Sequence, residues 1–262
     1  HALLTKLSAH GGHIGPNLGM VEATIALHYV FNSPVDKIVY DVSHQSYAHK
    51  MLTGRKDAFL HAEEYDEVTG YTNPQESKHD FFTIGHTSTS VSLACGLAKA
   101  RDLKRGRENI IAVIGDGSLS GGEAYEGLSN AGETGTNLIV VVNDNEMSIA
   151  ENHGGLYQNL KDLRDSDGQT PCNFFKSLGL DYIYVKDGND ITALIHAFTQ
   201  VKDIPRPVVV HIHTLKGKGY TLAETYKERF HWGMPFNLET GQPLSDGGNT
   251  EDYCNLTGKF LL

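Results

Sequence analysis

Five short, mostly apolar runs rich in β-branched residues mark this chain. They lie at 37–41, 110–114, 138–142, 182–185 and 207–213. Apolar runs of this length are typical of strands that a parallel sheet buries on both faces. Before and between these runs, three stretches carry apolar residues at helical spacing. They are 18–30, 121–131 and 191–198. The alternation predicts an α/β fold, a parallel sheet with helices on both faces.

Polar residues ahead of the apolar stretches predict where the helices begin. Asn17 is expected to cap the helix at 18–30, and Asp190 is expected to cap the helix at 191–198. The stretch 85–90 opens a further helix and offers hydroxyls and free N–H groups that could hold an anion or a polar group. A Ser/Thr-rich cap without a ligand is the alternative there. His49 and Lys50 are expected on a helix surface.

Composition narrows the function classes. The chain has 262 residues, of which 39% are hydrophobic and 21% charged, as in a soluble globular protein. A formal net charge of -10 argues against nucleic acid or an anionic membrane as partner. Cys95, Cys172 and Cys254 lack metal-ligand spacing and indicate the reduced thiols of an intracellular protein. No apolar run approaches the roughly 20 residues that span a bilayer.

Two polar turns follow the predicted strands at 110–114 and 138–142. The first is Gly-Asp-Gly with Asp116 at its centre, and the second is Asn-Asp-Asn ending in Asn145. Parallel strands end at the same edge of a sheet, so a carboxylate and an amide oxygen are expected side by side. Such oxygens suit Mg²⁺, which takes further oxygens from a bound phosphate. An ordinary βαβ unit is the alternative, because turns favour Gly, Asp and Asn in any case.

Other polar residues are expected to converge on this edge. Gly115 and Gly117 permit a sharp turn and a close approach to a diphosphate. The helix beginning near Gly121 adds its positive end. Lys216 and Lys218 lie in a Gly-rich loop and could neutralise phosphate. Further polar residues follow strand ends or lie in turns at helix starts. They are His13, His44, His86 and Tyr220.

The motifs GDGSLSGGEAYEGLSNAG and NDNEMSIAEN resemble those of the 1-deoxy-D-xylulose-5-phosphate synthase family, in the transketolase superfamily. The resemblance implies a domain at 1–236 that binds thiamine diphosphate and Mg²⁺. It also implies a linker and the start of a following domain at 237–262. The glutamate that activates the cofactor in this family has no counterpart here. We therefore expect the intact protein to be longer and this part alone to be inactive.

The resemblance also implies roles for individual residues. The magnesium ligands would be Asp116, Asn145 and the backbone carbonyl of Met147. Cofactor contacts would come from a larger set around the strand ends. This set is His44, Gly85, His86, Thr87, Gly117, Ser118, Asn145 and Tyr220. His13 and His231 would serve proton transfer or substrate contact.

The implied activity is the thiamine-diphosphate-dependent condensation of pyruvate with D-glyceraldehyde 3-phosphate. Its products are 1-deoxy-D-xylulose 5-phosphate and CO2, used for isoprenoid precursors, thiamine and pyridoxal. The resemblance further implies a transferase, a homodimer and a cytoplasmic location, with a plastid as the alternative. Two other readings stay open. One is the N-terminal subunit of a two-chain transketolase, and the other is a non-catalytic cofactor-binding module.

The chain departs from the family after the Asn-Asp-Asn turn. Typical members carry a much longer insertion between this turn and the next strand, where this chain has only a short polar segment at 153–182. Either this is a short-loop variant, or residues are absent from the chain. The departure concerns the lid that would cover the active site.

Overall fold

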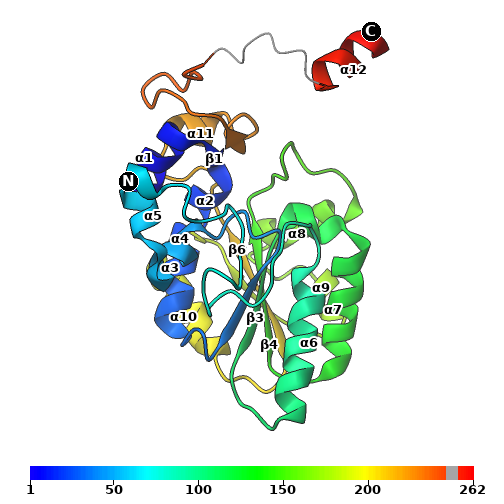
Figure 1. Ribbon diagram of the computed structural model, residues 1–262. Helices are drawn as coiled ribbons and strands as arrows, with labels where there is room; N and C mark the ends of the chain where they lie inside the picture. The colour runs from blue at the N-terminus through cyan, green and yellow to red at the C-terminus, as the bar shows by residue number, and fades with distance from the viewer. Residues whose placement is uncertain (246–252) are drawn as a thin grey trace.

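A five-stranded parallel sheet forms the centre of the molecule, which we describe from a computed structural model covering residues 1–245 and 253–262 (Figure 1). The strand order is β2-β3-β4-β6-β5. The strands are β2 Lys37–Tyr40, β3 Ile110–Gly115, β4 Leu138–Asp144, β5 Asp181–Val185 and β6 Pro207–His213. Each lies where an apolar run predicted it, and the parallel sheet is confirmed.

Strand β4 is the middle strand, and every one of its residues is buried. Its Val141 pairs with Val113 of β3 on one side and with Val210 of β6 on the other. The chain leaves β4, forms the edge strand β5 and returns as β6 between the two. The strand order therefore reverses beside β4, and ligands of open α/β sheets bind at such a position.

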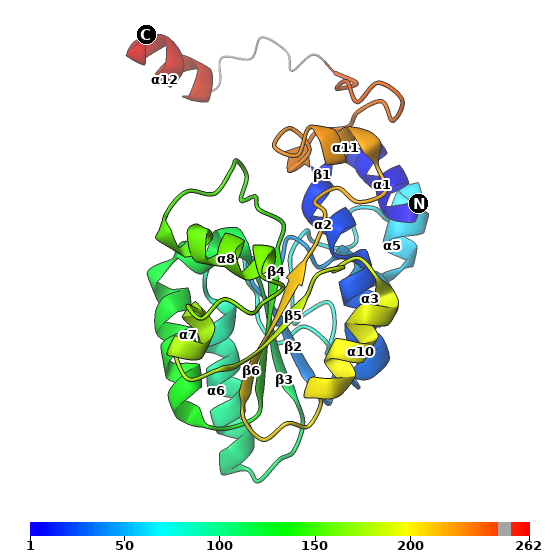
Figure 2. The ribbon, with the colours of Figure 1, turned by 180° about the vertical axis from the view of Figure 1, so that it is seen from behind.

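Helices cover both faces of the sheet, as the sequence predicted (Figure 2). On one face, Ala112 and Val140 of the sheet share a core cluster with Leu128 of α7. On the other face, the alternate residues Ile111 and Val141 pack with α3 and α10. The first layer consists of α6 Ser90–Leu103, α7 Gly122–Thr134, α8 Gly155–Asp165 and α9 Phe174–Ser177. The second layer consists of α3 Val21–Val30 and α10 Ile191–Val201.

A smaller assembly lies above the carboxyl edge of the sheet (Figure 1). Its own apolar cluster joins residues from both ends of the described chain, among them Leu7 and Phe236. Within it, β1 pairs antiparallel with β7, and His13 lies opposite Trp232. The elements are α1 Ala2–His10, β1 Gly12–His13, α2 Gly15–Gly19, α11 Thr221–Thr225 and β7 Trp232–Gly233. This pairing brings His13 beside His231, although more than 200 residues separate them.

Short helical segments complete the described chain. They are α4 Tyr47–Lys50, the π-helix Met51–Arg55, α5 Asp57–Leu60, the 3-10 helices Ala62–Glu64 and Asp116–Ser120, and α12 Tyr253–Leu261. Residues between 54 and 80 otherwise form irregular structure. In the part of the chain described, no helix combines the length and the apolar character needed to cross a membrane.

Two local predictions fail, each because of a distant partner. Asn17 does not cap the helix at 18–30, because it lies inside α2 and donates to the carbonyls of His13 (2.8 Å) and His44 (2.7 Å). His49 and Lys50 are fully buried rather than on a helix surface. Polar partners offset their burial, because Asp80 lies 2.9 Å from His49 and Glu76 lies 2.5 Å from Lys50. The cap at Asp190 is confirmed, since its carboxylate accepts from two N–H groups of α10.

Candidate active site at the carboxyl edge of the sheet

A cavity of about 230 Å³ lies at the carboxyl edge of the sheet. Most of the predicted site residues line it. They are His13, His44, Thr87, Asp116, Gly117, Ser118, Asn145, Met147 and His231. Lys216 lines it as well, whereas Gly85, His86 and Tyr220 do not. Residues that follow four different strands therefore meet in one cavity, as the strand-end argument predicted.

Asp116 and Asn145 reach the cavity from neighbouring strands. Gly115 of β3 pairs with Asn143 of β4, so the two turns start side by side. The Asp116 carboxylate accepts from Asn152 Nδ2 at 2.8 Å, and Asn145 Oδ1 accepts from the backbone N–H of Met147 at 3.2 Å. Burial raises the pKa of Asp116 well above its ordinary value, and the nearby Asp144 raises it further. A cation bound here would relieve both costs.

Asp144 is a buried carboxylate to which the sequence analysis gave no role. Burial alone would raise its pKa, but His211 and Arg164 outweigh that effect and bring it to about 2. His211 Nε2 lies 2.9 Å from Asp144 Oδ2, and Arg164 Nη1 donates to the same oxygen at 2.5 Å. The only hint in the sequence is its place in the Asn-Asp-Asn turn. The sequence of the turn does not reveal its two partners, because Arg164 lies in α8 and His211 lies in β6.

Three histidine rings lie close together in the wall of this cavity. The His13 centroid lies 4.9 Å from that of His44 and 5.6 Å from that of His231, and the last two are 5.5 Å apart. Burial lowers the pKa of His13 and of His231 to about 4, and it lowers that of His44 well below its usual range. At neutral pH all three are therefore uncharged imidazoles, each with one nitrogen to donate and one to accept a hydrogen bond.

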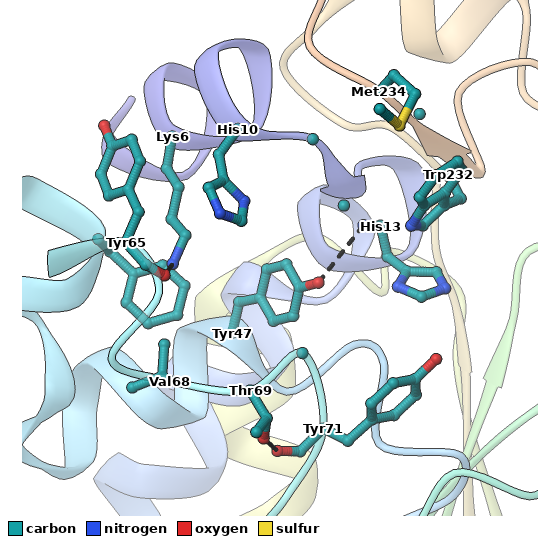
Figure 3. Close-up of a pocket in the computed structure, with 15 residues that line it drawn as sticks. Lys6, His10, His13, Tyr47, Tyr65, Val68, Thr69, Tyr71, Trp232 and Met234 are labelled. Carbon is teal, nitrogen blue, oxygen red and sulfur yellow. Dashed lines mark hydrogen bonds between the residues drawn. The ribbon is translucent and has the colours of Figure 1, made fainter. Parts of the chain in front are cut away.

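His13 separates this cavity from a second one. The second cavity, of about 250 Å³, lies between α1, the irregular segment near 70 and β7, and aromatic rings form much of its wall. His13 lines both cavities. Figure 3 shows its ring near Trp232 and Tyr71, and the Tyr71 ring centroid is 6.1 Å away. The histidine thus has two open sides rather than a place in a packed core.

Lys216 adds a positive charge to the cavity. Its side chain is buried, and Nζ donates to the backbone carbonyl of Ser148 at 2.6 Å. Burial lowers its pKa to about 8, so the ammonium form still dominates at neutral pH. Asp116 lies near enough to favour that charge. One carboxylate and one ammonium thus line the cavity together, a combination suited to a metal ion and an anionic group bound side by side.

The anion cradle predicted at 85–90 is already filled by the protein itself. Asp41, which follows β2, accepts from the backbone N–H of Ser88 at 2.8 Å and of Ser90 at 2.9 Å. These donors at the start of α6 are therefore not free for a ligand. Thr87 still lines the cavity, but Gly85 and His86 are exposed outside it. The sequence showed the donors and not the acceptor, which lies more than 40 residues earlier.

Tyr220 points into an aromatic cluster of the smaller assembly. Its ring centroid lies 5.5 Å from that of Phe230 and 6.2 Å from that of Phe236. Its hydroxyl donates to the backbone carbonyl of Leu238 at 2.9 Å. The structure therefore places Tyr220 next to the segment that carries His231, and not among the residues that line the cavity.

The lining residues fit thiamine diphosphate and Mg²⁺. Three buried polar atoms on the lining residues, Nδ1 of His44, Nδ1 of His231 and Oε1 of Gln45, have no hydrogen-bond partner among the residues that the structure describes. At Gly117 a Cβ atom would come within 2.7 Å of Ser148 Oγ, so only glycine permits this close approach. Within residues 1–245 and 253–262, no group of three or more His, Cys, Asp or Glu side chains could hold a metal. Mg²⁺ commonly takes several of its oxygens from bound phosphate and water, so it does not require such a group.

Solved structures show which class of protein shares this fold. The chain is similar to transketolase from Leishmania mexicana, with a TM-score of 0.70 and 21% identity over 90% of this chain and 38% of that one. Transketolase from Campylobacter jejuni gives a TM-score of 0.68 and 21% identity, covering 89% of this chain and 39% of that one. The fold is thus the thiamine-diphosphate-binding α/β fold of the transketolases.

Sequence comparison gives the family. The family model described as 1-deoxy-D-xylulose-5-phosphate synthase matches residues 1–170 and 166–214. Curated 1-deoxy-D-xylulose-5-phosphate synthases are similar along nearly the whole chain. The protein of Caldanaerobacter subterraneus is 41% identical over 99% of this chain and 47% of its own length. That of Symbiobacterium thermophilum is 44% identical over 99% of this chain and 45% of its own. The chain belongs to the 1-deoxy-D-xylulose-5-phosphate synthase family.

Three further facts come from these matches. The chain spans about half the length of the curated relatives it matches. The alignment with the Caldanaerobacter protein runs over 295 positions, more than the 262 residues of this chain, so that relative has residues with no counterpart here. The family-model match divides at 166–170, between α8 and α9. The departure noted in the sequence analysis falls in this same segment.

Proposed function

We propose that this chain is the cofactor-binding part of a thiamine-diphosphate-dependent transferase, a 1-deoxy-D-xylulose-5-phosphate synthase. The reaction would condense pyruvate with D-glyceraldehyde 3-phosphate and release CO2. One observation carries the proposal: a carboxylate, an amide, an ammonium and three uncharged imidazoles from distant parts of the chain line one cavity at the carboxyl edge of the sheet. Membership of the family supports the choice of substrates.

Residues from two strand ends would hold the metal and the diphosphate. Asp116, Asn145 and the backbone carbonyl of Met147 would bind Mg²⁺, and the diphosphate would supply further oxygens. Gly117 lines the cavity beside Asp116, and Lys216 would offset negative charge on the phosphates. Thiamine diphosphate, when bound, supplies a nucleophilic carbon and an electron sink for carbon–carbon bond chemistry.

The histidines would handle protons around the substrate. Because the His13 and His231 rings are uncharged at neutral pH, each can accept a proton from a hydroxyl or donate one to a carbonyl oxygen. The unpartnered Nδ1 of His231 leaves one hydrogen-bonding position open in the cavity wall. His44 would seat the cofactor through its own unpartnered Nδ1. Burial of these rings also limits the water that could take a proton instead.

Several finer assignments are part of the same proposal. Residues 1–236 would form the cofactor-binding domain, and 237–262 would lead into a further domain. The protein would act as a homodimer in the cytoplasm, and its product would feed isoprenoid, thiamine and pyridoxal synthesis. The family resemblance supports these assignments.

A substrate test separates this proposal from its rivals. The intact protein, loaded with thiamine diphosphate and Mg²⁺, would be given pyruvate with and without D-glyceraldehyde 3-phosphate, and separately a ketose phosphate with an aldose phosphate. The proposal predicts rapid CO2 release only when pyruvate and the aldehyde phosphate are both present. Turnover of the ketose phosphate alone would indicate a transketolase. No turnover of either pair would indicate a non-catalytic module.

A further inference from the structure

One arginine ties helix α8 back to the strand that precedes it. Arg164, in the last turn of α8, donates from Nη1 to Asp144 Oδ2 at 2.5 Å and from Nη2 to Glu146 Oε2 at 3.2 Å. Asp144 ends β4 and Glu146 lies in the loop just after it, so the contact closes residues 144–164 into a ring. The side chains of Arg164 and Asp144 are only 11% and 1% exposed. Water therefore screens this pair much less than a surface ion pair.

The ring of residues 144–164 includes Asn145 and Met147, the proposed metal ligands that directly follow β4. Glu146 lies between Asn145 and Met147 and has a φ of 66°. This left-handed conformation costs free energy in a residue other than glycine, so contacts must maintain it. Arg164 holds the Glu146 carboxylate from one side, and His213 Nε2 lies 3.1 Å from it on the other. The strained turn is therefore fixed through its own side chain.

The same loop reaches the other metal ligand. Asn152, three residues before α8, donates to Asp116 Oδ2 at 2.8 Å. Movement of α8 would displace Asn152 and with it a contact of the carboxylate. Only Leu160 and Leu163 of α8 are buried. Few fully buried apolar side chains therefore hold this helix against the sheet.

Asp144 is a firm anchor for the arginine. His211 Nε2 lies 2.9 Å from Asp144 Oδ2, and the other ring nitrogen of His211 lies 2.8 Å from the Tyr182 hydroxyl. These partners belong to β6 and β5, so the sheet itself fixes the carboxylate. The family-model match divides at 166–170, directly after Arg164, where the connection in this chain is short.

We propose that Arg164 is a positioning residue of the metal site: it clamps Asp144 and Glu146 and so holds the loop 145–152 in the conformation that presents Asn145 and Met147 to Mg²⁺. The inference rests on the proposed function, because it concerns the same site. Arg164 itself is not among the residues that line the proposed cofactor cavity.

The test compares three variants of the intact protein. Arg164→Gln removes the charge and the forked contact, and Arg164→Lys keeps the charge alone. Lys161→Gln is the matched control, because Lys161 lies on the same helix and forms its ion pair with the exposed Asp165. Two quantities are measured for each: amide hydrogen exchange across residues 146–154 without ligand, and the Mg²⁺ concentration that gives half-maximal binding of thiamine diphosphate.

We expect Arg164→Gln to speed exchange in 146–154 and to raise the required Mg²⁺ concentration by about ten-fold or more, as loss of a residue that orients metal ligands does. Arg164→Lys should recover part of that loss, and Lys161→Gln should behave as the wild type. The inference is overturned if Arg164→Gln binds with the wild-type Mg²⁺ requirement. It is also overturned if exchange rises equally throughout the sheet, which would indicate only a general loss of stability. Wild-type protein that binds no thiamine diphosphate would instead overturn the proposed function, and the exchange data would report on the loop separately.

Discussion

Asp116 and Asp144 illustrate how different partners give two neighbouring buried carboxyl groups opposite pKa shifts. Both are buried, yet Asp144 is bonded to Arg164 and His211 and has a pKa of about 2, whereas burial and the charge of Asp144 raise the pKa of Asp116. The difference arises from partners, because the sequence places both in similar polar turns. Asp144 is therefore a fixed charge, and Asp116 is the carboxylate that we propose as a metal ligand.

The first prediction concerns Asp116→Asn. In EDTA this variant should be more stable than the wild type, by on the order of 1 kcal/mol, because it removes a buried charge beside Asp144. With Mg²⁺ and thiamine diphosphate the order should reverse, since only the wild type gains stability from ligand binding. Thermal unfolding in both buffers measures this. Asp57→Asn, at an exposed position, is the control, and equal stabilisation of Asp116→Asn and the wild type by the ligands would refute the metal assignment.

The second prediction is a pH dependence of stability. His13, His44 and His231 have lowered pKa values in the folded protein, about 4 for the first and the last, against an ordinary value of about 6.5. Between pH 6.5 and 4 the unfolded chain therefore binds more protons than the folded one, and acid destabilises the fold. The contribution of these three histidines to the free energy of unfolding should be constant above about pH 6.5 and fall below it, by at most about 1.4 kcal/mol per pH unit for each histidine.

Urea unfolding at several pH values measures whether the free energy of unfolding falls as the pH is lowered. His44→Gln should make the decline between pH 6.5 and 4 shallower, because one of the protons taken up on unfolding is removed. His196→Gln, at an exposed position on α10, should leave the slope as it is. A wild-type stability that rises toward pH 4 would contradict the uncharged state of these rings.

Among the elements, the five strands could be predicted from the sequence and several helix starts could not. Runs such as 138–142 are apolar throughout because helices cover both faces of the sheet. Burial on both faces can therefore be recognised from the residue types alone. Asn17 and the stretch 85–90 look like caps locally. Their roles depend on His44 and Asp41, which chain folding brings from 27 residues away in the first case and more than 40 in the second. Local pattern carries no information about such partners.

The third prediction follows from the contact between Asp41 and α6. Asp41→Asn replaces one of the two acceptors by a donor that would face a backbone N–H, so it should cost about 2 to 3 kcal/mol of stability. Asp190→Asn is the matched control, because Asp190 also accepts from two helix N–H groups but is exposed, and it should cost less than about 1 kcal/mol. Urea denaturation compares the two. Equal costs would mean that the burial of Asp41 adds nothing.

The fourth prediction concerns the helix that follows the Gly-Asp-Gly turn. Leu128 of α7 is fully buried in the core of the first face, so Leu128→Ala should lower the free energy of unfolding by about 2 to 5 kcal/mol. Leu103→Ala, at the exposed end of α6, should change it by less than about 0.5 kcal/mol. The measurement is the urea midpoint at unchanged slope. A small effect at Leu128 would place α7 away from the sheet.

At the scale of the molecule, the meeting of strand ends could be predicted and the strand order could not. Parallel strands must end at one edge, so the approach of Asp116 to Asn145 followed from the polar turns alone. The insertion of β6 between β4 and β5 leaves no local trace, and neither does the pairing of β1 with β7 that brings His13 to His231. The position of Tyr220 outside the cavity could not be predicted either, because it depends on packing with Phe230 and Phe236 in the smaller assembly.

The most direct test of the account is a calorimetric titration of the intact protein with thiamine diphosphate, in Mg²⁺ and again in EDTA, with Asp116→Asn beside the wild type. We expect the wild type to bind thiamine diphosphate in Mg²⁺. Binding should be weakened at least about ten-fold both in EDTA and in the Asp116→Asn variant. Binding of equal strength in Mg²⁺ and in EDTA, or by Asp116→Asn and the wild type, would contradict a metal-assisted diphosphate site at this edge of the sheet.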